Sequence, residues 1–447
     1  MAAASHRRSL RKRRTLAVSA AVVAAGVGAG VFVMNANATA ADLYHQTLAA
    51  KDGWAASGTG TTGGAKADSA HTFTVSTRAQ LVKALGSASD TTPRIIKVKG
   101  TIDANTDDSG KKLTCADYAK GTGYSLSAYL KAYAPATYGR SKLPSGTQEK
   151  ARAAAQQNQA KNVVLKVPAN TTIVGVPGTK AGITGGDLTV KGVDNVIIRN
   201  LTFSATEDCF PQWDPTDGDK GNWNSQYDTV TLRGATHVWA DHNTFTDAPH
   251  FDSATPHYYG RQYQVHDGDL DITNGSDLVT VEHNQFTDHD KTMLIGSSDK
   301  DSTGKLRVSI HHNVWKGIVQ RAPLARIGQI HVYDNLYDTT TVDGYAPLYS
   351  INSRAKAQVV AQNNVWKVPS GGKVAQLLSG DGTGSIAGSG NLVNGTATDL
   401  VAVYNAANSK KIKTTVNWTP TLTAGLESSV KNLPAELATT TGAGVLK

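Results

Sequence analysis

Short stretches of alternating apolar and polar residues recur along the chain from about residue 163 onward. Most are followed by an asparagine, one further residue and an aromatic residue. Seven segments share this pattern: "VIIRNLTF", "VWADHNTF", "VTVEHNQF", "VSIHHNVW", "IHVYDNLY", "VVAQNNVW" and, more weakly, "IAGSGNLV". Alternation over a few residues predicts half-buried β-strands. We therefore expect this part of the chain to consist of short strands of one repeated type.

One asparagine per repeat gives the length of the repeating unit. The asparagines lie 43, 41, 29, 22, 29 and 27 residues apart: Asn200, Asn243, Asn284, Asn313, Asn335, Asn364 and Asn391. The shortest interval fits about three strands and three tight turns, which is one coil of a parallel β-helix, and longer intervals add loops. An asparagine tolerates the tight turn, and its amide can bond to the asparagines of neighbouring coils. We assign these residues a structural role.

The expected fold is all-β, a right-handed, single-stranded parallel β-helix with a short helical N-terminal cap and loop insertions. A propeller or a sandwich would also contain many short strands. Its hairpins, however, would need turns of the Asn-Gly type, which are scarce in this sequence. We expect residues 41–447 to form a single domain.

Three parts of that domain lie outside the repeats. The segment "STRAQLVKALGSA" predicts a cap helix with Leu81, Val82 and Leu85 on one face, and "RIIKVKGTID" predicts a strand after it. Residues 104–160 form an inserted excursion with helices at "SLSAYLKAYA" and "TQEKARAAAQQNQA". Residues 400–447 lose the pattern and should form a tail that covers the last coil.

Residues 1–40 have the parts of an export signal. The basic segment "RRSLRKRR" precedes the apolar run "TLAVSAAVVAAGVGAGVFVM" and the small-residue site Ala38-Thr39-Ala40. We therefore exclude these residues from the fold and predict a secreted protein without a membrane partner after cleavage. The apolar run is also long enough to anchor the chain in a membrane, and the paired arginines leave Sec and twin-arginine export open.

The signal segment also explains most of the positive charge. The formal net charge is +9, but six of the 45 basic residues lie before residue 41, which leaves 39 basic residues against 36 acidic ones. No basic stripe interleaved with aromatic residues is present, so nucleic acid is not an expected partner. The cysteines, Cys115 and Cys209, lack zinc-binding spacing, and an exported protein leaves their pairing in a disulfide open.

Charged residues occupy similar positions in successive repeats. Counted from the asparagine in coils of 22 residues, Asp228, Asp267, Asp271, Lys291 and Arg321 fall at positions 5 to 9 of four successive coils. They should therefore stack on one strand face. That face should point outward, because burying such charges inside the coil would be very costly.

The order of charges along this stack suggests a chemistry. Carboxylates come first, then the ammonium of Lys291 and the guanidinium of Arg321, with Arg326 just beyond. Closely spaced carboxylates repel unless a cation holds them, and their hard oxygens favour Ca²⁺. A groove with calcium at one end and basic residues at the other suits a carboxylated polysaccharide. Ca²⁺ on a uronate carboxylate would acidify the neighbouring C–H, which is the chemistry of β-elimination.

Other chemistry has less support. Neighbouring residues of a strand point to opposite faces, so His311 and His312 are not expected to share a metal. The glycine-rich segment "GDGTGSIAGSGN" opens no helix and therefore is not a phosphate loop, and no GxSxG-type motif is present.

These residues lie in motifs that resemble the pectate lyase family. The likeness runs over most of the chain after the signal: "GWAASGTGTTGG", "TIVGVPG", "NVIIRNLTF", "FPQWDPTDG", "NWNSQYD", "THVWADH", "HDGDLD", "HDK" and "QRAPLARIG". The last of them contains the family's R-x-P-x-x-R sequence. The resemblance implies a parallel β-helix enzyme that cleaves α-1,4-polygalacturonate internally and leaves a 4,5-unsaturated end.

The resemblance also implies a calcium site. Asp228, Asp267 and Asp271 would bind Ca²⁺, and Asp217 in "WDPTDG" would help to bind further Ca²⁺ that arrives with the substrate. The expected partner is pectate, an acidic polysaccharide. We expect a monomer, since a capped β-helix needs no partner to cover its ends.

The catalytic roles implied by the resemblance fall on basic residues. Arg321 would remove the C5 proton of a galacturonate, while Lys291 and Arg326 would hold its carboxylates. A guanidinium normally stays protonated. We therefore expect nearby calcium and Lys291 to disfavour the charged form of Arg321, and activity to rise at alkaline pH.

Three alternatives remain. A pectin lyase would take methyl-esterified substrate without calcium, but the three aspartates argue against it. A polygalacturonase would hydrolyse the bond with paired carboxylates. The segment "NTDD" at 105–108 resembles part of that signature but lies in the excursion. A non-catalytic β-helix that only binds polysaccharide would need the charged groove but not Arg321.

Overall fold

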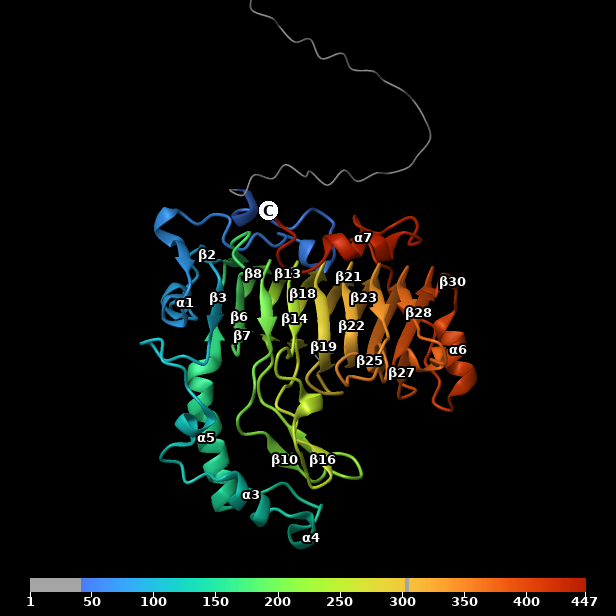
Figure 1. The fold of residues 1–447 in the computed structure, drawn as a ribbon. Helices are drawn as coiled ribbons and strands as arrows, with labels where there is room; N and C mark the ends of the chain where they lie inside the picture. The colour runs from blue at the N-terminus through green and yellow to red at the C-terminus, as the bar shows by residue number, and fades with distance from the viewer. Residues whose placement is uncertain (1–41, 302–304) are drawn as a thin grey trace, which may run out of the picture. The chain divides into compact units, whose positions relative to one another are not determined.

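Residues 42–301 and 305–447 are described by the computed structural model, so the predicted export signal lies outside them. Their short strands wind into three columns of parallel strands, called faces A, B and C below (Figure 1). One coil, for example, consists of β17 (Leu270–Thr273) on face A, β18 (Asp277–Glu282) on face B and β19 (Gln285–Lys291) on face C. The expected parallel β-helix is confirmed.

Each face collects one strand from successive coils. Face A contains β4 (Val164–Lys166), β7 (Asp187–Lys191), β12 (Val230–Arg233), β17, β20 (Leu294–Ile295), the first parts of β23 (Leu324–Tyr333) and β25 (Ile351–Gln362), and β27 (Leu378–Gly380). Face B contains β1 (Thr72–Val75), β2 (Arg94–Val98), β5 (Thr171–Gly175), β8 (Asp194–Arg199), β13 (Thr236–Asp241), β18, β21 (Arg307–His311), the later parts of β23 and β25, and β28 (Ser385–Ser389). Face C contains β3 (Thr101–Asp103), β6 (Gly182–Thr184), β9 (Thr202–Ser204), β14 (Thr244–Thr246), β19, β22 (Val314–Gln320), β24 (Leu336–Asp338), β26 (Val365–Lys367), β29 (Leu392–Val393) and the antiparallel β30 (Thr396–Ala397). Because β23 and β25 pass from face A to face B without a break, these two faces form one 16-stranded sheet.

A ladder of asparagine amides joins the coils at the turn between faces B and C. Each side-chain nitrogen donates to the side-chain oxygen of the next asparagine, at 2.9 to 3.2 Å, along the series Asn243, Asn284, Asn313, Asn335, Asn364 and Asn391. Asn200 does not belong to this series, contrary to the prediction. Leu201 occupies the ladder position, and its N–H donates to the Asn243 side-chain oxygen at 3.2 Å.

Asn200 belongs instead to a row of residues with left-handed backbone, each immediately before a ladder position. Its φ is 56°, and His242, His283 and His312 have φ of 51°, 50° and 53°. This conformation breaks the strand alternation. The rings of His311 and His312 therefore meet, with their Nδ1 atoms 2.9 Å apart, and the expectation that they point to opposite faces is wrong.

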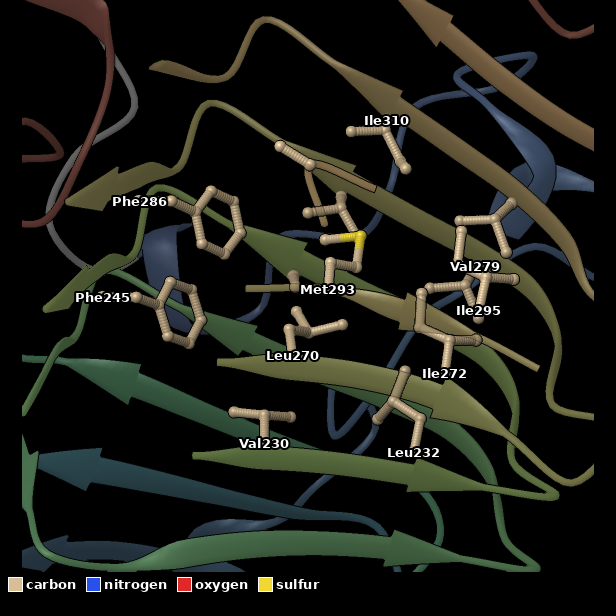
Figure 2. Packing of buried hydrophobic residues seen from close by; sticks show 14 of the residues in the cluster. Val230, Leu232, Phe245, Leu270, Ile272, Val279, Phe286, Met293, Ile295 and Ile310 are labelled. Atoms are coloured by element: carbon tan, nitrogen blue, oxygen red, sulfur yellow. The ribbon is translucent and has the colours of Figure 1, made fainter. Parts of the chain in front are cut away.

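The inside of the coils is filled by stacked side chains. The aromatic residues of the repeats form one stack with ring centroids 4.2 to 5.9 Å apart: Phe203, Phe245, Phe286, Trp315, Tyr337 and Trp366. Figure 2 shows Phe245 and Phe286 beside aliphatic side chains such as Leu270 and Met293. Burying each such side chain stabilises the fold by about 1.5–3 kcal/mol.

Helices cover the first coil. The helix α1 (Arg78–Leu85) begins at Thr77, whose side chain accepts a hydrogen bond from the Gln80 N–H. Leu81 and Leu85 are buried as expected, but Val82 is 39% exposed, and Ala84 takes the buried position instead. The buried face of α1 is therefore rotated by part of a turn from the face that the sequence predicted.

The chain then leaves the coils and forms a helical arm. It consists of α2 (Cys115–Ala119), α3 (Leu126–Ala132), α4 (Pro135–Tyr138) and α5 (Thr147–Val163), so both helices predicted in this segment are confirmed (Figure 1). A disulfide between Cys115 and Cys209 ties α2 to the loop after β9. The arm thus belongs structurally to the loops of the coils that follow it.

The last residues pack along the coils. The helix α6 (Leu400–Ala407) contacts β27 and β28 in the last coil. After α7 (Leu433–Thr440) the chain reaches the early coils, where the Gly444 N–H donates to the Asn200 side chain at 2.7 Å. Across the described ranges, 42–301 and 305–447, no helix is long and apolar enough to cross a membrane.

The ladder should contribute strongly to stability. Asn313 donates to Asn335 and to two backbone carbonyls, and it accepts two hydrogen bonds from Asn284. Asn313→Ala leaves several of these buried groups unpaired, and we expect it to lower the free energy of unfolding by about 2–4 kcal/mol in urea titrations. Asn432→Ala is the matched control, since Asn432 is exposed and its side chain caps no helix N–H. Equal stabilities of the two variants would contradict a structural ladder.

Candidate active site

The charged residues predicted from the repeat meet at a corner of the coils, where face C strands end and face A strands begin. Lys291 ends β19, and Arg321 directly follows β22. Asp271 is the second residue of β17, and Asp228 lies two residues before β12. The prediction that these residues stack in one group is confirmed by the geometry, but they occupy a corner and its loops instead of one strand face.

The carboxylates at this corner are buried and close to one another. Asp228 accepts hydrogen bonds from the Gly268 N–H (3.1 Å) and the Thr231 hydroxyl (2.8 Å), and Asp271 accepts one from the Leu294 N–H (2.9 Å). Burial, followed by repulsion from its neighbouring aspartates, raises the pKa of Asp228 well above its ordinary value. Burial and the charge of the neighbouring Asp267 raise the pKa of Asp271 to about 7. Both groups therefore favour a bound cation or a proton.

Gly268 leaves the space between these carboxylates open. A Cβ atom at this position would lie 2.5 Å from Asp271 Oδ1 and 3.0 Å from Asp228 Oδ1. Oxygen ligands bind Ca²⁺ at about 2.3–2.6 Å, so a side chain here would occupy the space that an ion between the carboxylates needs. The donor set, the raised pKa values of Asp228 and Asp271, and this gap fit calcium held by Asp228, Asp267 and Asp271.

Two basic residues lie directly beside the aspartates. Lys291 Nζ is 3.6 Å from Asp267 Oδ1, and the side chain is almost fully buried. Arg321 has a left-handed backbone (φ 62°), and its carbonyl accepts a hydrogen bond from the Met293 N–H at 2.7 Å. Its buried Nε has no hydrogen-bond partner among the residues that the structure describes. Arg321 also lines the cleft described below, so its head group is available to a bound molecule.

Arg326 lies next to Arg321 but is bound differently from the expectation. Its guanidinium donates to the carbonyls of Gly296 (3.1 Å) and Ser297 (2.9 Å), and its Nε is 3.6 Å from Asp299. Burial and the neighbouring Arg321 lower its pKa below the ordinary arginine value. In this arrangement Arg326 does not line the cleft above Arg321.

An open cleft of about 710 Å³ lies over the corner. Asp267, Lys291 and Arg321 line it, and so does Asp217, which comes from the loop after β10 (Gln212–Asp214). The other lining residues, which the sequence did not reveal, are Asn222, Asn224, His257, Gly260, Arg261, Gln262, Gln264, Asp290 and Gln320. Most of them belong to loops of variable length, where the repeat gives no position.

Beneath the cleft, a buried histidine fixes the loop that carries Asp267. The two ring nitrogens of His289 lie 2.6 Å from the Asp247 carboxylate and 2.7 Å from the Asp267 carbonyl oxygen. Burial disfavours the charged ring, but Asp247 and Asp269 outweigh it and raise the pKa of His289 well above its ordinary value. A protonated ring donates from both nitrogens, so it connects the coil interior to the aspartate loop.

Comparison with known proteins shows the family to which this chain belongs. The family profile described as pectate lyase matches residues 141–439. A pectate lyase of Bacillus subtilis (strain 168) is 50% identical over 416 residues, which are 92% of this chain and 96% of the relative. The chain belongs to the pectate lyase family. Pectate lyase E of Dickeya chrysanthemi is also similar, at 33% identity over 79% of this chain and 76% of its own.

Solved structures of pectate lyases have the same fold. A pectate lyase bound to a hexasaccharide matches with a TM-score of 0.86 and 47% identity, over 91% of this chain and all of that one. A thermostable pectate lyase matches with a TM-score of 0.87 and 40% identity over the same shares. The chain is therefore a polysaccharide lyase, and the resemblance noted in the sequence is confirmed.

The raised pKa of Asp271 predicts an unusual effect on stability. With chelator present at pH 8, Asp271 carries a buried charge that no cation binds in the folded enzyme, so Asp271→Asn should increase the free energy of unfolding by about 1–3 kcal/mol. The folded-state pKa of about 7 lies above the unfolded value of 3.8. Protonation therefore stabilises the folded wild type, and the gain should shrink as the pH falls below 7.

Urea titrations at pH 8 and pH 6 in chelator measure this effect. Asp217→Asn, which changes an exposed aspartate of the same cleft, should leave stability unchanged. If Asp271→Asn is less stable than the wild type at pH 8 without calcium, the prediction is wrong. Other groups of the protein would then already stabilise the charged Asp271 carboxylate.

Proposed function

We propose that this protein is a calcium-dependent pectate lyase that cleaves α-1,4-polygalacturonate within the chain by β-elimination. The observation that carries the proposal is that Asp267, Lys291 and Arg321 line one open cleft, with the buried Asp228 and Asp271 close to Asp267. The family relationship supports the reaction class, and the hexasaccharide bound by a similar pectate lyase supports a polymeric substrate. Asp217 at the cleft edge is a further calcium ligand in this proposal.

Arg321 is the proposed base. It would take the proton from C5 of a galacturonate, and the electron pair of that C–H bond would form the C4=C5 double bond. The C4–O bond would break, and the oxygen would leave with the neighbouring sugar and take a proton from water. Calcium, when bound to the substrate carboxylate, would withdraw negative charge from it and so make the C5 proton more acidic. Lys291, buried and close to Asp267, would bind the same carboxylate and stabilise the developing negative charge.

Arg326 would bind substrate in this arrangement. A rotation of its guanidinium away from Gly296 and Ser297 would bring it to a substrate carboxylate. The base must be neutral to accept a proton, so we propose that the rate rises at alkaline pH. We also propose that residues 1–40 direct secretion and that the mature enzyme acts as a monomer outside the cell.

Replacement of Arg321 tests the catalytic assignment. Arg321→Ala should lower kcat by roughly 10²–10⁴-fold with little change in KM, because it removes the base while leaving the calcium ligands in place. The ultraviolet absorbance of the unsaturated product from polygalacturonate measures the rate. Arg233→Ala, at an exposed arginine of face A, should keep full activity. Normal kcat in Arg321→Ala would rule out Arg321 as the base.

Replacement of Gly268 tests the calcium site. Gly268→Ala places a methyl group between the two buried carboxylates, so the calcium concentration for half-maximal activity should rise at least tenfold. Arg233→Ala, at an exposed arginine of face A, should leave this concentration unchanged. Full activity of the wild type in excess chelator would refute calcium dependence and favour a pectin lyase.

A further inference from the structure

A second group of metal-ligating side chains lies at the end of the face B strands, away from the corner that carries Arg321. Glu282 is the last residue of β18, and His311 is the last residue of β21, directly opposite it in register. Asp52 reaches the same place from the N-terminal segment. Because face B ends at the ladder turn, this group lies on a different corner of the coil from the proposed calcium site.

The ligand atoms of this group converge at distances suited to one ion. His311 Nε2 lies 3.5 Å from Asp52 Oδ1 and 3.7 Å from Glu282 Oε2, and all three atoms lie within 4.8 Å of one another. Ligand atoms that are about 2.0–2.2 Å from a tetrahedral ion stand roughly 3.3–3.6 Å apart. The two separations from His311 Nε2 are therefore close to those of ligands around one ion, and they are too long for hydrogen bonds of ordinary strength.

Two of these atoms have no other partner. His311 Nε2 and Asp52 Oδ1 are buried, and neither has a hydrogen-bond partner within the described part of the chain. His311 itself is only 1% exposed. A buried polar atom without a partner costs about 1–3 kcal/mol, so a ligand that binds both atoms would remove a large penalty.

The local charges favour a cation at this point. Burial, together with Glu282, raises the pKa of Asp52 to about 8, and burial raises that of Glu282 to about 8 as well. Burial and neighbouring histidines lower the pKa of His311 far below its ordinary value, so its ring is neutral. The nearby Arg199 does not compensate these carboxylates directly, since its guanidinium is paired with Asp241 at 2.6 Å.

The surrounding contacts hold the three ligands in place. Glu282 accepts a hydrogen bond at 2.6 Å from the Trp239 indole through its other oxygen. His311 Nδ1 is hydrogen-bonded to His312 Nδ1 at 2.9 Å, which fixes the ring orientation. The Asp52 backbone pairs with Thr423 in an isolated bridge. Such outer contacts are typical of metal ligands in proteins.

Two similar clusters lack these properties. In the group Asp241, His242 and His283, the aspartate already has Arg199 as its counter-ion. In the group Asp247, Asp252 and His266, all three side chains are at most 2% exposed and the protonated His289 compensates Asp247. The Asp52 side chain keeps 18% exposure, so an ion can reach its site from solvent and keep a water ligand.

We propose that Asp52, Glu282 and His311 bind a divalent transition-metal ion of the Zn²⁺ class. One imidazole and two carboxylates, with a fourth position left for water, match the ligands that zinc prefers, whereas calcium takes oxygen ligands alone and in larger number. The ion joins the N-terminal segment to two strands of face B. Its role is to fasten this segment onto the coils, and it takes no part in the lyase reaction.

Zinc titration of the mature enzyme tests this proposal. The enzyme is first stripped with chelator and then held in excess Ca²⁺, so that the calcium ligands are occupied. We expect isothermal titration with ZnCl₂ to give one site per chain and zinc to raise the Tm by several degrees. Asp52→Asn should weaken zinc binding at least tenfold and abolish the Tm shift, while its lyase activity in calcium stays at the wild-type level.

Two controls make the outcome decisive. Asp68→Asn, at an exposed aspartate of the same N-terminal segment, should bind zinc like the wild type. Co²⁺ bound to the wild type should give visible d–d absorption typical of a tetrahedral site, which needs no variant to fold. The proposal is overturned if the wild type binds no zinc in excess calcium, if Asp52→Asn binds it equally well, or if the cobalt spectrum is that of an octahedral aquo ion.

Discussion

The structure depends on one constraint, namely that each coil must lie directly above the last in fixed register. The asparagine ladder enforces this register at the turn between faces B and C. There, one amide satisfies a backbone carbonyl of its own coil, another of the preceding coil, and the side chain of the next asparagine. Once this turn is fixed, the aromatic rings two residues later must stack, and every strand that follows begins at a defined height. The register of the ladder thus also fixes the corner between faces C and A, where the acidic and basic residues of successive coils meet.

That register allows the enzyme to hold charges that would not otherwise stay together. Asp228 and Asp271 come from different coils and are both buried. Burial, followed by the charge of neighbouring aspartates, raises the pKa of both. A flexible site would relax by moving them apart or by admitting water. The rigid coil instead keeps them close, so the cost of their repulsion is converted into affinity for a cation. The same reasoning applies to the Asp52 group, although its third ligand comes from a segment outside the coils.

The sequence predicted what depends on the repeat and missed what depends on loops. The strand pattern and the spacing of the asparagines were sufficient for the fold, and counting from the asparagines brought Lys291 and Arg321 together correctly. Asn200 was misplaced by one residue, because a strand pattern cannot show which residue of the turn takes the left-handed conformation. The same turn explains the error over His311 and His312.

The positions of other residues could not be predicted from the sequence, for different physical reasons. Gly260 and Gln264 line the cleft, but they lie in loops whose length varies from coil to coil. The hydrogen bonds that Arg326 donates to backbone carbonyls could not be predicted from the sequence, because every residue has a backbone carbonyl. The packing of Cys115 against Cys209 required the path of the helical arm, which no periodic pattern encodes.

The cleft is made of parts with separate origins. Its floor consists of coil residues whose positions the ladder fixes, whereas its walls come from the loops around β10 and from Arg261 in the hairpin strand β16 (Arg261–Gln262). Insertions or deletions in those loops would leave the floor unchanged. Related proteins with other loops would therefore differ in the length or the substituents of the polymer that they prefer, while the catalytic residues of the floor stay in place.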